Sequence, residues 1–466
     1  MTINGRLIVG ETLRVLRADM DSRVAPDLSD PDARLAARMI SELLAYLAMW
    51  HLDLPEDLSH HLAARAALAE QPDEDAGLTG DLPVEAPAYG RLASALQQRI
   101  EDDNGLDPGF LRAVAAADSA LYADETRRLE QGTVIARERL ERVEVEATPE
   151  RAQALVTALL GAGRTVTALS RVPGGMSKDS FFLDIREPDG AELRLVIRRD
   201  LPWGPAQTTV LDEYARLTRL FELGLPIAEP LGCDATRILG QPAMLSRRVA
   251  GSSGTAPWDA DPQSRRTVCL ELAAVMARLH RVDPAAVDMP QASRDPREQV
   301  RAYVIEWRDR WRRNRVHASP TLAAAFAWLL DNIPAEIDGP AIVHGDIGFH
   351  NAIVDNEKLV ALLDWEFAHV GDPTEDLSYC RQFVEGLLPW EDFVAGYRAA
   401  GGGEYRAENA RFFELWRSVR NAITCSVAWR GFLDGSYPAL KMASQGISAY
   451  RYFIRNTAET LKERLA

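Results

Sequence analysis

The sequence predicts an α+β protein, and three successive patterns along its 466 residues indicate this class. Apolar side chains recur at helical spacing through the first 145 residues. From Arg164 the pattern changes to short β-rich runs between turn residues, and after residue 250 it is mainly helical again. We therefore expect a helical accessory domain in residues 1–145, a small β-rich lobe in 146–250 and a large helical lobe in 251–466.

The first segment carries the signals of a helical bundle. Ser29 or Asp30 can cap a helix that has Pro31 in its first turn. The helix that follows, to about His51, places a stripe of apolar residues on one face: Leu35, Met39, Ile40, Leu43, Leu44 and Leu47. Residues 71–87 are acidic and contain several Pro and Gly, which predicts a linker. We expect four to six helices here, for oligomerisation or for binding a partner.

The second segment begins with signals of a sheet. Three β-rich runs predict its first strands: residues 165–172, 181–186 and 193–198. The turn after the first run contains Gly174 and Gly175, which would let backbone N–H groups approach phosphate oxygens. Ser177 could add a hydroxyl to such a loop. An ordinary hairpin turn is the alternative for this motif.

The third segment is mainly helical. Apolar residues recur at helical spacing in seven ranges: 262–282, 296–316, 320–333, 376–384, 390–399, 406–434 and 444–465. In the second, Trp307 and Trp311 lie four residues apart, which favours a core stripe with a solvated basic face opposite.

The candidate catalytic residues lie in one stretch, from Ile342 to Asp376. It contains His344-Gly345-Asp346, then Asn351 five residues after the Asp, and then Asp364 after an apolar run. Phosphoryl transfer from a nucleotide needs a base for the attacking hydroxyl and oxygen ligands for Mg²⁺. One Asp, an Asn and a second Asp can supply these parts. The alternative is that each residue merely caps a loop.

The spacing in this stretch predicts a geometry that brings the candidates together. Residues 341–343 are apolar and predict a buried strand, followed by a polar loop. Two more apolar runs, 352–354 and 359–363, flank the turn-forming residues 355–358 and predict a hairpin. The hairpin would bring Asp364, at the end of the second strand, back beside Asn351, at the start of the first strand.

The motif HGDxxxxN followed by LLDWEFAHVGDPTEDL resembles the aminoglycoside phosphotransferase/choline kinase superfamily. The DWE and GDPxxDL forms resemble the branch that includes kinase domains found with acyl-CoA dehydrogenases. The resemblance covers about Thr165 to Leu461 and implies a bilobal, protein-kinase-like fold. It implies that Asp346 is the catalytic base and that Asn351 and Asp364 hold Mg²⁺. Three further residues would be structural around the site: His344, Asp372 and Asp376.

The same resemblance implies a nucleotide site in the β-rich lobe. Its residues would be Gly174, Gly175, Ser177, Lys178, Arg198, Glu213, Ser246 and Arg248. Arg198 stands where protein kinases hold the phosphates with Lys, and Arg can bind phosphate with two parallel hydrogen bonds. Glu213, on a helix predicted over 208–223, would be its partner. Related proteins often have Asn where this chain has Lys178. The alternative for Arg198 is a solvated residue on an edge strand. The alternative for Glu213 is that it serves only to favour the helix.

The composition excludes some classes of protein. A net charge of −16 opposes nonspecific nucleic-acid binding, which needs a basic surface, but not nucleotide binding. The four cysteines show no CxxC spacing, so we expect free thiols in a reducing cytoplasm. The N-terminus lacks the pattern of a secretory signal. No uncharged apolar run reaches 18 residues, so we expect no membrane span.

The function that these observations predict is phosphorylation of a small-molecule hydroxyl with ATP or GTP as donor and Mg²⁺ as cofactor. The acceptor suggested by the resembling branch is a hydroxyacyl-CoA or a related catabolic alcohol. An aminoglycoside or macrolide antibiotic is the alternative acceptor, although the arginine-rich stretch from Arg301 to Arg315 favours an anionic one. A non-catalytic nucleotide-binding scaffold is a third hypothesis, against which the intact Asp346, Asn351 and Asp364 argue.

Overall fold

The computed structural model describes part of residues 17–44 and then the ranges 93–101, 108–130, 147–172, 177–201, 208–316, 318–433, 442 and 444–465. The chain divides into two compact units. The mixed unit comprises Glu144–Tyr303 and Ile333–Glu414, and the helical unit comprises Met1–Val143, Val304–Asn332 and Leu415–Ala466. The predicted linker over residues 71–87 lies outside the described ranges.

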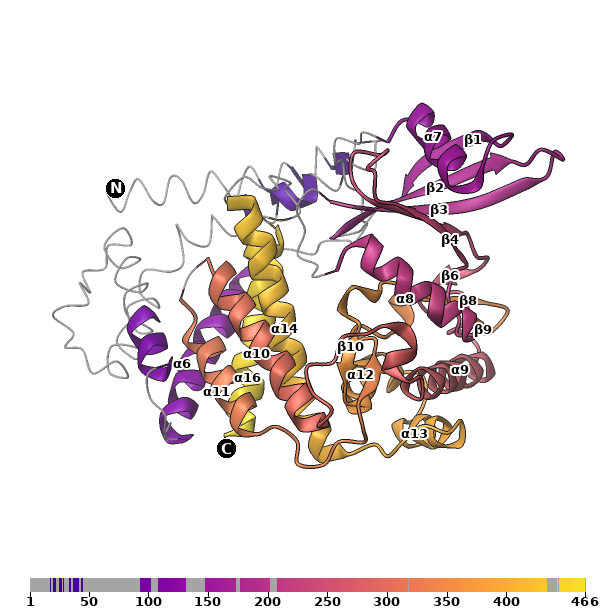
Figure 1. The fold of residues 1–466 in the computed structure, drawn as a ribbon. Coiled ribbons are helices and arrows are strands. Elements are labelled where there is room, and N and C mark those ends of the chain that lie inside the picture. Colours follow the sequence, from indigo (N-terminus) through magenta and orange to yellow (C-terminus); the bar gives the residue numbers. More distant parts are fainter. Residues whose placement is uncertain are drawn as a thin grey trace. The chain divides into compact units, whose positions relative to one another are not determined.

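An antiparallel five-stranded sheet forms the first part of the mixed unit (Figure 1). Its strands, in spatial order, are β1 (Thr165–Val172), β2 (Lys178–Arg186), β3 (Glu192–Asp200), β5 (Ala243–Arg247) and β4 (Pro230–Asp234). The first strand has its predicted bounds, and the next two extend beyond theirs because their pairing is continuous over nine residues. The predicted β-rich segment is thereby confirmed as a sheet.

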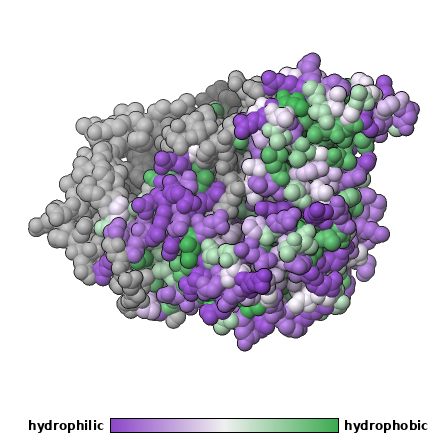
Figure 2. All heavy atoms as spheres, viewed as in Figure 1, coloured by the Kyte–Doolittle hydropathy of each residue, from purple (hydrophilic) through white to green (hydrophobic). Residues whose placement is uncertain are grey.

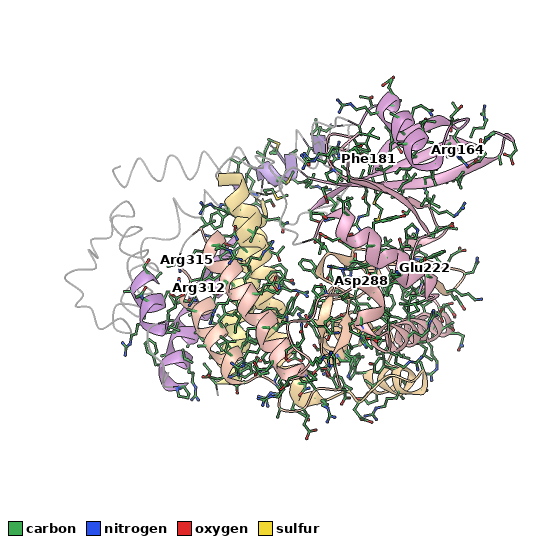
Figure 3. All side chains as sticks on the ribbon, in the orientation of Figure 1. Arg164, Phe181, Glu222, Asp288, Arg312 and Arg315 are labelled. Carbon is green, nitrogen blue, oxygen red and sulfur yellow. The ribbon has the colours of Figure 1, made fainter. Side chains whose placement is uncertain are left out.

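Two helices cover opposite faces of this sheet. Helix α7 (Pro149–Leu160) packs on β1 and β4, and helix α8 (Val210–Glu222) packs on β3, β4 and β5. Side chains alternate between faces along a strand. In β5, Leu245 therefore joins the core under α7, whereas its neighbour Met244 joins the core under α8. Figure 3 marks this lobe by Arg164, next to β1, and by Phe181, buried in β2.

The remainder of the mixed unit is mainly helical. Its elements are β6 (Ser252–Ser253), α9 (Pro262–His280), η2 (Pro284–Val287), β7 (Ala341–Val343), η3 (Phe349–Asn351), β8 (Ala352–Asp355), β9 (Lys358–Leu362), η4 (Trp365–Phe367), β10 (His369–Gly371), α12 (Pro373–Val384) and α13 (Trp390–Ala399). The predicted hairpin is present, because β8 and β9 pair antiparallel. Its turn residues Asn356 and Glu357 both take left-handed backbone angles, with φ of 47° and 62°, as a tight hairpin turn requires.

The helical unit combines segments from both ends of the sequence. Helix α6 (Pro108–Glu130) packs against α11 (Pro320–Asp331) and α16 (Tyr450–Arg464). Buried Asp118 of α6 accepts a hydrogen bond from the hydroxyl of Thr321 in α11. The described part of the N-terminal segment therefore shares its packing with helices from the C-terminal half. The predicted division at residues 145 and 250 stays a prediction.

Helices α10 (Pro296–Asn314) and α14 (Ala407–Leu433) each contain a boundary between the units. In the helical unit, Trp307 and Trp311 of α10 are at most 1% exposed, which confirms the predicted core stripe. Arg312, the arginine of this helix that Figure 3 labels, lies 3.4 Å from the carboxylate of Glu101. The tryptophans of this helix therefore serve packing.

The four cysteines are free, as predicted, and three of them are buried. None of the helices in the described ranges combines the length with the apolar character that crossing a lipid bilayer requires. On the face shown in Figure 2, hydrophilic side chains predominate over the helical parts, with hydrophobic ones scattered among them. Large exposed apolar side chains are few among the described residues, and the two most exposed are Leu223 and Tyr452, each at 52%.

We predict that Leu183→Ala destabilises the mixed unit by about 2–5 kcal/mol, because it leaves a cavity in the core between α7 and the sheet. Leu183 is fully buried in β2. Leu223→Ala, at a position that is 52% exposed, is the matched control and should change the free energy of unfolding by less than about 0.5 kcal/mol. Urea denaturation of both variants measures the difference, and equal effects would contradict the described core.

Candidate active site

The hairpin brings the candidate metal ligands to the same end of β8 and β9. The N–H of Leu363 donates a hydrogen bond to the carbonyl of Asn351 at 2.7 Å. Asp364 follows directly and takes a left-handed conformation, with φ of 63°. Such a conformation is uncommon for a residue other than glycine and persists where neighbours hold it, often at functional sites. The predicted juxtaposition of the two residues is therefore present.

Asp376, in the first turns of α12, holds the backbone of the polar loop after β7. One carboxylate oxygen accepts from the N–H of His344 and the other from the N–H of Gly345, both at 2.8 Å. Gly345 has a φ of 82°, which glycine adopts without strain. Fully buried Asp376 also receives a 3.2 Å contact from Nε2 of His280. Burial by itself would raise its pKa, but these hydrogen bonds and the histidines hold the pKa of Asp376 below its usual value.

His344 joins this loop to the hairpin. Burial lowers the pKa of His344, so its ring is neutral at neutral pH. Its Nδ1 accepts from the N–H of Asp346 at 3.3 Å, and its Nε2 therefore carries the proton and donates to the carbonyl of Leu363 at 3.0 Å. The two contacts set one tautomer. His344 thus fixes the loop of Asp346 relative to the residue before Asp364.

The carboxylate of Asp346 has several partners. Nδ2 of Asn351 donates both to its Oδ2 and to its backbone carbonyl, each at 2.9 Å. The hydroxyl of Tyr379, from α12, donates to its Oδ1. Nε2 of His350 lies 3.5 Å from the same Oδ1, and the side chain of Asp346 remains 18% exposed. The carboxylate is therefore oriented from two sides and still accessible.

Arg198 links the sheet to the hairpin. Its guanidinium lies 3.3 Å from the carboxylate of Glu213 in α8 and 3.0 Å from that of Asp364. Burial alone would lower the pKa of Arg198, but these carboxylates and Glu366 raise it above its ordinary value. Arg198 is therefore a permanent positive charge beside Asp364, and the predicted pairing of Arg198 with Glu213 is present.

Lys178 extends this network at the start of β2. Its ammonium is buried and lies 3.2 Å from Glu213 and 3.5 Å from Asp200. It also donates to the carbonyl of Thr208 at 2.6 Å. Glu213 therefore stands between two cations, Lys178 and Arg198. The structure brings Lys178 to the partner of Arg198, a contact that the sequence pattern did not suggest.

Glu366, the acidic residue of the DWE motif, was not singled out from the sequence. The hydroxyl of Ser177 donates to its carboxylate, and Glu366 is 8% exposed. Burial, and then the neighbouring Asp364, raise the pKa of Glu366 to about 8. Its position two residues after Asp364 was the available signal. Gly174 and Gly175, which precede Ser177 in the predicted phosphate loop, lie outside the described residues.

Ser246 and Arg248, two of the residues predicted for the nucleotide site, lie at the end of β5 and directly after it. Ser246 pairs with Val196 inside the sheet. The N–H groups of Arg247 and Arg248 donate to the carbonyls of Glu229 and Arg194, both at 2.9 Å. The guanidinium of Arg248 stacks over the ring of Phe182 at 3.7 Å. These backbone N–H groups are therefore used within the sheet.

Asp372 caps helix α12. Its carboxylate accepts from the N–H of Thr374 and from Nδ2 of Asn409, each at 2.8 Å. Burial raises the pKa of Asp372, although these hydrogen bonds oppose the rise. A capping carboxylate fixes where a helix begins, which explains why α12 starts three residues before its predicted start. The cap therefore sets the position of every side chain on α12.

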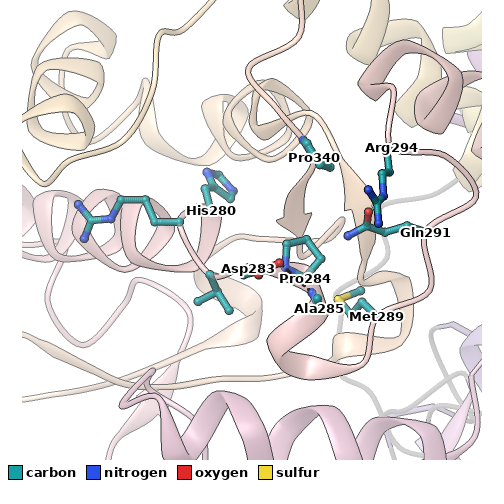
Figure 4. Close-up of a pocket in the computed structure, with 10 residues that line it drawn as sticks. His280, Asp283, Pro284, Ala285, Met289, Gln291, Arg294 and Pro340 are labelled. Atoms are coloured by element: carbon teal, nitrogen blue, oxygen red, sulfur yellow. Dashed lines mark hydrogen bonds between the residues drawn. The ribbon is translucent and has the colours of Figure 1, made fainter.

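A cavity of about 540 Å³ in the mixed unit lies apart from these residues (Figure 4). His280 lies on one side of it, and Gln291 and Arg294 lie on the other. Its lining includes none of the candidate catalytic or metal-binding residues. The candidate site is consequently defined by side-chain geometry and not by this cavity.

The donor set near the hairpin fits Mg²⁺ bound together with a nucleotide. Among the described residues, no group of three or more His, Cys, Asp and Glu side chains is arranged to hold a metal by itself. Mg²⁺ in nucleotide sites is typically held by one or two carboxylates and by phosphate oxygens. The nitrogen of the Asn351 amide donates to Asp346, which directs its oxygen away from that carboxylate. Asp364 is 39% exposed and provides a carboxylate.

Comparison with known proteins connects this geometry to a family. The model of the "Phosphotransferase enzyme family" matches residues 168–413, just over half of the 466 residues. Acyl-CoA dehydrogenase family member 11 of Gallus gallus is 28% identical over 293 residues, which are 61% of this chain and 37% of that protein. Family member 10 of Mus musculus is 26% identical over 213 residues, 44% of this chain and 19% of that protein. The chain spans well under half the length of these relatives.

A solved structure supports the fold. A proposed aminoglycoside phosphotransferase of Ralstonia eutropha matches with a TM-score of 0.50 and 18% identity. The match covers 68% of this chain and 98% of that one. This likeness confirms the predicted bilobal, protein-kinase-like α+β fold.

We predict that Glu366→Gln gains stability relative to the unchanged protein as the pH rises. Between about pH 4.5 and 8 the unfolded chain loses this proton while the folded chain keeps it, so the free energy of unfolding falls with pH. Gln does not titrate, so the variant should gain up to a few kcal/mol across this range. Glu222→Gln, at a side chain that is 54% exposed, is the control. Urea denaturation at pH 5 and pH 8, without divalent cations, measures the difference in the free energy of unfolding between each variant and the unchanged protein. A constant difference would contradict the buried, protonated carboxyl.

Proposed function

The chain belongs to the phosphotransferase enzyme family, and we propose that it transfers the terminal phosphoryl group of ATP to the hydroxyl of a small molecule. The observation that carries this proposal is the carboxylate of Asp346, oriented by Asn351 and still 18% exposed. A general base must be held by its neighbours and yet reach the proton it accepts. GTP is the alternative donor.

The proposed reaction is a direct displacement at phosphorus. The acceptor oxygen forms a bond to the γ-phosphorus while the bond from phosphorus to the β–γ bridging oxygen breaks. The proton of the acceptor hydroxyl passes to Asp346, and the nucleoside diphosphate leaves with the bridging oxygen. When bound, Mg²⁺ neutralises phosphate charge, and Asn351 and Asp364 would hold it.

Arg198 is proposed to bind the phosphates. It is charged, it lies in β3 and it already contacts Asp364 at 3.0 Å. Its pairing with Glu213, and that of Lys178 with the same carboxylate, orients both cations. An Arg–phosphate contact can form two parallel hydrogen bonds, which positions the donor as well as neutralising it. Ser177 would add a hydroxyl. Backbone groups from Ser246 to Arg248 would hold the edge of the adenine base.

The acceptor proposed is a hydroxyacyl thioester of coenzyme A. Both curated relatives carry "acyl-CoA dehydrogenase" in their names, and this chain matches a minor part of each. The arginine-rich helix supports an anionic acceptor less than its composition suggests, because some of its arginines have acidic partners within their own units. Arg301 contacts Glu298 at 3.6 Å, and Arg312 contacts Glu101 at 3.4 Å. Aminoglycoside and macrolide antibiotics are the alternative acceptors, and the assay includes both.

We predict that Asp346→Asn lowers the rate of phosphoryl transfer by on the order of 10²-fold or more, because the amide cannot accept the proton. Release of ADP, coupled to a spectrophotometric readout, is measured with hydroxyacyl-CoA, kanamycin and erythromycin as acceptors. Asp189→Asn, in the exposed turn between β2 and β3, is the matched control and should keep full activity. Full turnover by the Asp346 variant would refute the base assignment. Metal-independent nucleotide binding with no turnover of any acceptor would favour the scaffold hypothesis.

A further inference from the structure

One face of helix α12 contacts the loop of Asp346 at three places. Asp376, Tyr379 and Phe383 are spaced three and four residues apart, so they lie on the same side of the helix. Asp376 holds the loop backbone, and the Tyr379 hydroxyl holds the Asp346 carboxylate. The ring of Phe383 lies 4.9 Å from the ring of His350. The last two contacts bring aromatic rings beside the proposed base.

These rings form a packed group, which we call the aromatic wall: Tyr379, Phe383 and His350. The rings of Tyr379 and Phe383 lie 5.9 Å apart, within the usual range for aromatic pairs. Gly348 makes room for the rings of His350 and Phe383. A Cβ atom at Gly348 would lie 2.8 Å from both His350 and Phe383, closer than real contacts allow. The glycine therefore lets the wall close against the loop backbone.

The aromatic wall remains partly open beside the carboxylate. The His350 side chain is 42% exposed and the Asp346 side chain is 18% exposed, while Phe383 is half-buried. Aromatic rings in such a position gain free energy when apolar atoms cover them. The open part of the aromatic wall therefore favours an acceptor with apolar atoms next to its hydroxyl.

We propose that the aromatic wall contacts the carbon atoms next to the acceptor hydroxyl, so that the acceptor carries this hydroxyl on an aliphatic acyl chain. This inference rests on the proposed phosphoryl transfer and assigns the side chains that select its acceptor. Phe383 and His350 determine specificity, because they face the carbon chain. Tyr379 is a positioning residue, because its hydroxyl holds Oδ1 of Asp346 and leaves the transfer of the proton to that carboxylate.

The first experiment replaces the apolar surface. Phe383→Ser should raise the KM for a medium-chain hydroxyacyl-CoA, with methylenes on both sides of its hydroxyl, by about tenfold or more. The KM for ATP should not change. Phe383→Leu keeps an apolar side chain and should show a smaller rise. The control is Phe221→Ser, at a position in α8 that is 40% exposed, where neither constant should move.

The second experiment separates positioning from binding. Tyr379→Phe keeps the ring and removes the hydroxyl that holds Asp346. We expect kcat to fall by about tenfold, as when a hydrogen-bond partner that orients a metal ligand is lost. The KM for hydroxyacyl-CoA should stay unchanged. A rise in KM with unchanged kcat would contradict the positioning role.

The experiments can contradict the role of the aromatic wall without contradicting the proposed phosphoryl transfer. Equal KM values for Phe383→Ser and the unchanged protein, or preferred turnover of kanamycin, would overturn the wall and leave phosphoryl transfer intact. If no acceptor is turned over, calorimetric titration of hydroxyacyl-CoA into protein with Mg²⁺ and a non-hydrolysable ATP analogue decides the question. Weaker binding by Phe383→Ser supports the wall. Equal binding, or none by the unchanged protein, overturns it.

Discussion

The geometry of the candidate site depends on one buried carboxylate, Asp376. Its two oxygens accept from the N–H groups of His344 and Gly345, the residues directly before Asp346. A buried carboxylate without partners would be costly, so the loop and Asp376 each need the other. His280 adds a contact to the same carboxylate from α9, and its own Nδ1 contacts the hydroxyl of Tyr397 in α13. Three helices are thereby connected to the position of the proposed base.

Carboxylates outnumber cations between the sheet and the hairpin. Three carboxylates, those of Glu213, Asp364 and Asp200, lie within 3.5 Å of two cations, Arg198 and Lys178. Buried Glu366 adds a fourth carboxyl. Because a further uncompensated charge would be expensive there, its proton is retained up to a pH of about 8. The charge state of the group therefore follows from burial as much as from pairing.

Local patterns in the sequence predicted much of this molecule. Turn-forming residues between two apolar runs predicted the hairpin that returns Asp364 to Asn351, and the observed pairing agrees. The contacts of Tyr379 and Lys178 were beyond reach, because each depends on how separate elements meet. Tyr379 is 33 residues from Asp346, and Asp118 of α6 is 203 residues from Thr321 of α11. Periodicity specifies which face of a helix is apolar but not which distant helix covers it.

Helix α12 shows why such contacts nevertheless belong together. Asp372 begins the helix, and Asn409 holds Asp372 at 2.8 Å. Once the start of a helix is set, its 3.6-residue turn sets the direction of every later side chain. Asp376 reaches the loop backbone, and Tyr379 reaches the Asp346 carboxylate from the same face. A rotation of α12 would displace both contacts at once, and with them Phe383. The orientation of the proposed base and the shape of the acceptor surface are therefore set by the same helix cap.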